Sequence, residues 1–164
     1  VTLKSKEETK GTFYIKRPNS FRWEYAGEEE EEETLVVGNS EKVWIYEPEL
    51  MQVVELESEG SGTFFFTSLL NAMDDLGKNY NAVVVDSTLE SYSIRLEPKV
   101  AIPQIRQITI TVNKENFHVT KTVVDDKYGT RTTVALIGTE YNPEFEENLF
   151  IFKLPKGVKV VKPH

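Results

Sequence analysis

The stretch that decides the fold is Gly11-Thr-Phe-Tyr-Ile-Lys-Arg-Pro-Asn-Ser-Phe-Arg-Trp-Glu-Tyr25. In its second half, Phe21, Trp23 and Tyr25 alternate with charged residues, so the three aromatic side chains share one side of an extended chain. A first β-rich run, residues 12–16, precedes them, and Arg17 lies at its end immediately before Pro18. The stretch therefore predicts two β-strands, a short turn and one aromatic face.

Similar β-rich runs recur along the whole chain, separated by short segments with Gly, Asn, Asp or Pro. Connections this short favour antiparallel neighbours. Together they predict a mainly β fold of about ten strands, typical of a sandwich or a barrel. The predicted strands are residues 12–16, 21–25, 42–46, 51–56, 82–86, 92–97, 104–112, 117–124, 130–137 and 150–154.

One segment, residues 64–77, has helical spacing instead. Its apolar residues recur at steps of three and four, with Gly77 as a C-terminal stop. An amphipathic helix inserted in a closing sheet needs a surface for its apolar stripe, and the mouth of a barrel offers one. We therefore expect this helix to act as a lid; a core helix that never moves is the alternative. The apolar stripe consists of Phe66, Leu69, Leu70, Met73 and Leu76.

Composition excludes several classes of protein. The 27 acidic and 19 basic residues give a net charge of -8, which argues against binding nucleic acid or residing stably on an anionic membrane. The absence of cysteine excludes disulfides and thiolate metal sites. The only two histidines lie far apart, and no Gly-x-Ser-x-Gly motif is present. We therefore predict no enzymatic activity, no metal and no cofactor, in a single domain over residues 1–164.

The opening stretch, followed by Leu35-Val-Val-Gly-Asn-Ser-Glu-Lys-Val-Trp-Ile-Tyr-Glu-Pro-Glu-Leu-Met-Gln-Val53, resembles the outer-membrane lipoprotein carrier family, LolA. The shared order is a strand ending in Lys-Arg-Pro, an aromatic strand, a glycine turn and a Trp/Tyr strand. Residues 150–158, Phe-Ile-Phe-Lys-Leu-Pro-Lys-Gly-Val, resemble the closing strand and turn of the family. The resemblance extends over nearly the whole chain.

The resemblance implies an incomplete, half-open antiparallel β-barrel of about ten to eleven strands with an α-helical lid. It further implies a periplasmic carrier that takes acylated lipoproteins from the inner-membrane ABC transporter LolCDE to the outer-membrane receptor LolB. A monomer suits such a shuttle. Family members begin with an amphipathic helix and a first strand, and we expect that helix to be missing from this sequence. The alternatives on the same fold are a LolB-like receptor and a periplasmic regulator that senses a lipid or a partner.

The site residues follow from the resemblance and the pattern together. The resemblance implies that Arg17 holds the lid by bonding helix carbonyls, for which its five donors are suited; an exposed turn residue is the alternative. Phe21, Trp23 and Tyr25, with Trp44 and Tyr46 as further candidates, line a lipid cavity or simply fill a core. The acidic run at residues 28–33 is expected to be a solvated loop tip, with a metal or basic-partner site as the alternative.

Overall fold

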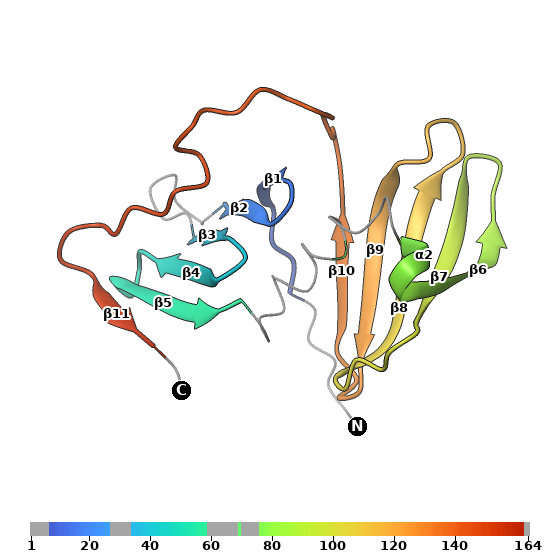
Figure 1. The fold of residues 1–164 in the computed structure, drawn as a ribbon, viewed down its shortest axis with the longest axis horizontal. Helices are drawn as coiled ribbons and strands as arrows, with labels where there is room; N and C mark the ends of the chain where they lie inside the picture. Colours follow the sequence, from blue (N-terminus) through green and yellow to red (C-terminus); the bar gives the residue numbers. More distant parts are fainter. Residues whose placement is uncertain (1–6, 27–33, 59–68, 70–75, 163–164) are drawn as a thin grey trace. The chain divides into compact units, whose positions relative to one another are not determined.

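The computed structural model describes residues 7–26, 34–58, 69 and 76–162. These residues contain eleven β-strands and the short helix α2 (Leu76–Asn79), so the predicted mainly β fold is confirmed (Figure 1). Contacts divide the chain into two compact units, one of residues 1–73 with 144–164 and one of residues 74–143. In the described part of the chain, no helix has the length and apolar character needed to cross a membrane.

The first unit contains a six-stranded sheet of order β1-β2-β3-β4-β5-β11. Strands β1 to β5 form an antiparallel meander, as their short connections predict, whereas β11 lies parallel to β5 with Lys159 opposite Gln52. The strands are β1 (Gly11–Lys16), β2 (Ser20–Tyr25), β3 (Thr34–Gly38), β4 (Lys42–Glu47), β5 (Gln52–Glu57) and β11 (Lys159–Val161).

One face of this sheet is apolar because the strand registers align apolar residues across it. Residues directly opposite each other on paired strands share a face. One row across the sheet is Phe13, Trp23, Val36, Ile45 and Val54, and the next is Ile15, Phe21, Gly38, Val43 and Leu56. These two rows, with Tyr25, are termed the aromatic face.

The opposite face of the same sheet is crossed by residues 144–155, termed the strap. The ring of Phe145 lies 6.3 Å from that of Tyr14, and the ring of Phe152 stacks on Trp44 at 5.7 Å. Between them, Arg22 Nη1 donates a hydrogen bond of 3.4 Å to the carbonyl oxygen of Leu149. The strap therefore passes from β1 to β4 within the first unit.

The predicted strand at residues 150–154 is wrong. The backbone there makes local turns, with Leu149 N donating to Glu146 O and Ile151 N to Asn148 O, both at 3.1 Å. The edge of β5 is occupied by β11, so no sheet edge is left there for the strap to extend. The alternation of residues 150–154 reflects aromatic side chains that pack on a sheet face, not a strand that pairs within it.

Gly38 accommodates the ring of Phe21, its partner across the β2–β3 ladder. A Cβ at Gly38 would lie 2.2 Å from Cζ of Phe21. We expect Gly38→Ala to lower the free energy of unfolding by about 1–3 kcal/mol, because the ring must leave a packed position. Urea denaturation, monitored by tryptophan fluorescence, measures this decrease in the free energy of unfolding. Gly77→Ala, where the added Cβ would meet nothing within 4 Å, is the control, and equal midpoints for the two variants would contradict the prediction.

The second unit contains a five-stranded antiparallel sheet of order β10-β9-β8-β7-β6. One of its rows is Ala82, Leu96, Ile108, Val124 and Thr132, and the next is Val84, Ile94, Ile110, Thr122 and Val134. These two rows are termed the aliphatic face, and Leu96, Ile108 and Ile110 are buried at its centre. The strands are β6 (Tyr80–Ser87), β7 (Ser91–Pro98), β8 (Ile105–Asn113), β9 (Val119–Asp126) and β10 (Arg131–Ala135).

Asp125 and Arg131 pair across β9 and β10 on the other face of this sheet. Arg131 Nε donates to Oδ1 of Asp125 at 2.7 Å and Nη2 donates to Oδ2 at 3.0 Å. Hydrogen bonding from Arg131 holds the pKa of Asp125 below its usual value, with a smaller contribution from the charge of Arg106. Because the folded pKa is lowered, the stabilisation is present above the unfolded pKa of about 3.9 and is lost as pH falls through the folded value.

We therefore expect Asp125→Asn to lower the urea midpoint at pH 7 and to lose its effect in acid. Unfolding curves of wild type and variant, recorded from pH 7 down to about pH 3, give the difference as a function of pH. The difference should shrink below about pH 4. A difference that stays constant across this range would show that the ion pair does not contribute to the pH dependence of stability.

Candidate functional site

Strand β2 places three predicted site residues on the aromatic face, as their alternation predicts. Phe21 is fully buried, Trp23 is 9% exposed and Tyr25 is half-buried. The ring of Trp23 lies 5.0 Å from that of Phe13 and 5.8 Å from that of Tyr25. Burial raises the pKa of the Tyr25 hydroxyl. Together with Phe13 of β1, these residues form an aromatic cluster on the two strands at one edge of the sheet.

Aliphatic side chains extend the apolar surface of this aromatic cluster across strands β3, β4 and β5. Val36, Ile45 and Val54 extend the row of Trp23, and Val43 and Leu56 extend the row of Phe21. Neither row contains a charged side chain. Such a surface offers dispersion contacts and apolar burial but few hydrogen bonds, so it suits hydrocarbon better than a polar ligand.

Trp44 and Tyr46, the other aromatic candidates, lie on the opposite face of the sheet. Trp44 is opposite Val37, in the row of Arg22, and stacks on Phe152 of the strap. Tyr46 is two residues further along β4 and so shares this side. Neither residue therefore belongs to the aromatic face.

Arg17 lies in the turn between β1 and β2, where its side chain is exposed. The partners that the lid hypothesis gives it belong to residues 64–77, of which the structure describes only Leu69, Leu76 and Gly77. Leu69 is helical and 2% exposed, and α2 extends two residues past Gly77, the expected stop.

The other lid residues, Phe66, Leu70 and Met73, and the acidic run at 28–33 lie outside the described residues. The role of Arg17 stays a prediction.

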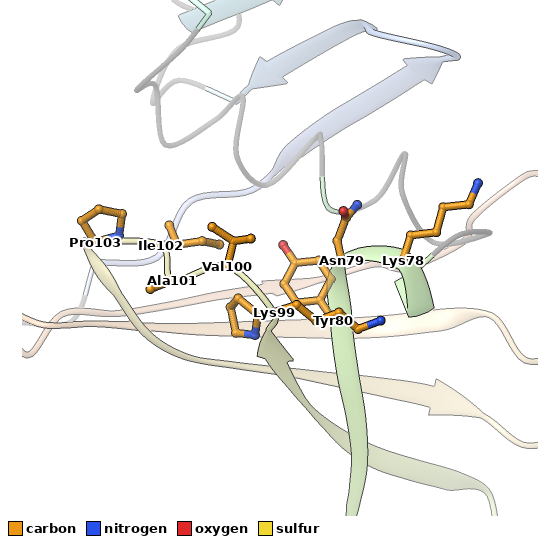
Figure 2. Close-up of a pocket in the computed structure, with 9 residues that line it drawn as sticks. Lys78, Asn79, Tyr80, Lys99, Val100, Ala101, Ile102 and Pro103 are labelled. Carbon is orange, nitrogen blue, oxygen red and sulfur yellow. The ribbon is translucent and has the colours of Figure 1, made fainter.

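The second unit contains an apolar hollow that no sequence pattern indicates. It has a volume of about 340 Å³ and lies where β6 begins and β7 ends (Figure 2). Figure 2 shows the ring of Tyr80 between α2 and the loop that carries Val100 and Ile102. Lys99 Nζ donates to the carbonyl oxygen of Gly77 at 2.5 Å, which ties this loop to α2. The hollow contains none of the predicted site residues.

No cluster suited to a metal ion occurs among the described residues, where at least three His, Cys, Asp or Glu side chains would have to meet. Asp125 and Asp126, adjacent in sequence, bind different groups: Asp125 pairs with Arg131, and Asp126 Oδ1 accepts from the backbone N–H of Tyr128 and Thr130. Their carboxylates therefore do not converge on a common point, as an acid/base pair would require.

Comparison with known proteins relates the chain to lipoprotein carriers. The model of the family described as outer membrane lipoprotein carrier protein LolA matches residues 1–153. A relative named outer-membrane lipoprotein carrier protein, from Cupriavidus pinatubonensis, is 27% identical over 161 residues, 98% of this chain and 74% of the relative. The relative of the same name from Neisseria gonorrhoeae is 28% identical over 163 residues, covering 98% and 76%.

A third relative of that name, from Chromohalobacter salexigens, is 28% identical over 157 residues, 95% of this chain and 72% of its own length. The strand order β1 to β5 and the aromatic strand β2 fall within the matched residues. The family match includes all but the last eleven of the 164 residues. The chain therefore belongs to the outer-membrane lipoprotein carrier family.

Proposed function

We propose that this protein is a periplasmic carrier that binds the acyl chains of lipoproteins and shuttles them from the inner to the outer membrane. Its relatives are named as carriers of this kind, which supports the proposal. The observation that carries it is the aromatic face, where two uncharged rows run across five strands. No covalent bond is made or broken in such a cycle.

The free energy of acyl burial is adequate for this task. Removing a C16 chain from water yields on the order of 10 kcal/mol at about 0.8 kcal/mol per CH₂. Ordering of the chain and displacement of whatever covers the cavity subtract from this value. The remainder is compatible with binding that is tight in transit and reversible at the acceptor.

The finer architecture that the family resemblance implies is part of the proposal. This architecture is an incomplete antiparallel barrel with a lid helix at residues 64–77. The carrier would receive lipoproteins from LolCDE and deliver them to LolB. Two observations support it: both sheets have one apolar face, and Leu69 is helical and buried. Arg17, at the tip of the β1–β2 hairpin, would bond the carbonyls of the lid helix and favour the closed, empty state.

The first test compares wild type with Arg17→Leu in lipoprotein release from spheroplasts. Wild type should bring a triacylated lipoprotein into the soluble fraction as a one-to-one complex. The variant should keep its cargo longer when an acceptor is added, because loss of the latch destabilises the closed state that competes with cargo. Arg95→Leu, which removes an exposed arginine paired with Glu97 in β7, is the matched control.

Each part of the proposal fails on a different result. If no lipoprotein is released but a fluorescent fatty acid still binds, the ligand is a free lipid. If cargo is bound but remains with membranes, the protein acts as a receptor. If Arg17→Leu and Arg95→Leu both hand over cargo at the wild-type rate, the carrier function stands and Arg17 is not its latch.

A further inference from the structure

A single hydroxyl is buried without a partner on the aliphatic face. Thr122, in β9, is 1% exposed, and its Oγ1 has no hydrogen-bond partner among the residues that the structure describes. It lies between Ile110 of β8 and Val134 of β10 in one row across the sheet. Thr120, two residues earlier in the same strand, differs because its Oγ1 donates to the carbonyl oxygen of Thr111 at 3.4 Å.

This hydroxyl is unfavourable for the fold by itself. A buried polar group without a partner destabilises a protein, whereas an apolar group of the same shape is neutral or stabilising. Valine has that shape and is equally suited to a strand. The fold therefore gains nothing from the Thr122 hydroxyl that valine would not supply.

We infer that Thr122 Oγ1 donates a hydrogen bond to a carbonyl oxygen of the bound acyl lipid, an inference that rests on the proposed carrier function. An acyl chain joined through an ester or amide presents one acceptor, the carbonyl oxygen, at the head of a long hydrocarbon. The Thr122 hydroxyl is one donor, and the apolar side chains of Ile110 and Val134 lie on either side of it. The donor matches the carbonyl oxygen of such a lipid, and the apolar side chains match its hydrocarbon.

Burial makes this donor effective. No group in the described part of the chain bonds the hydroxyl, so a ligand carbonyl can accept its hydrogen bond without displacing one of these groups. Ile110 beside it is also closed off from solvent, and a hydrogen bond shielded from water is stronger than an exposed one. Thr122 would thus select lipids with a carbonyl at the head of the chain over plain hydrocarbon.

The test uses two fluorescent probes that differ only in this acceptor: a diacylglycerol with ester-linked chains and its diether analogue, which lacks the carbonyls. Wild type should bind the ester roughly tenfold more tightly than the ether, as one unopposed hydrogen bond predicts. Thr122→Val should remove this preference, and Thr122→Ser should retain it. Thr120→Val is the matched control and should leave the preference unchanged.

The ratio of the ester affinity to the ether affinity reports on the Thr122 hydroxyl alone, because a general change in packing would alter both affinities together. Thermal unfolding of Thr122→Val should occur at or above the wild-type temperature, which shows that the variant is folded. If wild type and Thr122→Val bind both probes with the same ratio, the role of Thr122 is refuted while lipid binding stands. If wild type binds neither probe, the proposed function fails, and the inference fails with it.

Discussion

Phe21→Ala should lower the free energy of unfolding by about 3–5 kcal/mol, one of the two largest effects expected in this chain. Phe21 is fully buried, and its ring lies against Gly38 of β3, a residue with no side chain to fill the space left behind. The cavity left by the ring would therefore collapse only partly. The sequence neighbours of Phe21 cannot compensate, since they point to the opposite face.

Urea denaturation of wild type and Phe21→Ala measures this loss. Phe117→Ala is the matched control, because Phe117 is 72% exposed and should lose less than about 0.5 kcal/mol. In buffer without urea, the affinity of the folded variant for a fluorescent fatty acid reports separately on the aromatic face. Weaker binding supports a role in the cavity; unchanged binding with reduced stability would assign Phe21 to the core alone.

The strands that could be predicted from the sequence are those with clear alternation or long β-rich runs. In β2, the charged residues between Phe21, Trp23 and Tyr25 mark the side that each residue faces, and the structure confirms it. The long strands β7, β8 and β9 were predicted to within about two residues at each end for the same reason. The missed strands β3 and β11 are short, with five and three residues, so alternation had little length in which to appear.

Other features depend on turn conformation, strand register and burial, which the alternation of residue types does not show. Strand β9 begins at Val119 and not at residue 117, because Phe117 adopts a left-handed φ of 59° in the turn before it. The sequence also does not show that Trp44 lies on the opposite face from Phe21, because alternation assigns sides within one strand, whereas register relates one strand to the next. The unpaired Thr122 hydroxyl likewise follows from burial, which the sequence of β9 does not show.

Ile108→Ala is the second large effect and should lower the free energy of unfolding by about 2–5 kcal/mol. Ile108 is fully buried in β8, the central strand of the five-stranded sheet, between Leu96 and Val124. Ile137→Ala is the control, since Ile137 is 92% exposed and its truncation removes little packing. Equal losses for the two isoleucines would contradict the assignment of Ile108 to a core.

The same two core variants test whether residues 1–164 fold as one cooperative domain, as their length predicts. Phe21 belongs to one compact unit and Ile108 to the other. If the chain unfolds in one step, each variant should shift the whole transition, with both fluorescence and circular dichroism reporting the same midpoint. If the units unfold independently, Ile108→Ala should leave the fluorescence transition in place, because Trp23 and Trp44 both lie in the first unit.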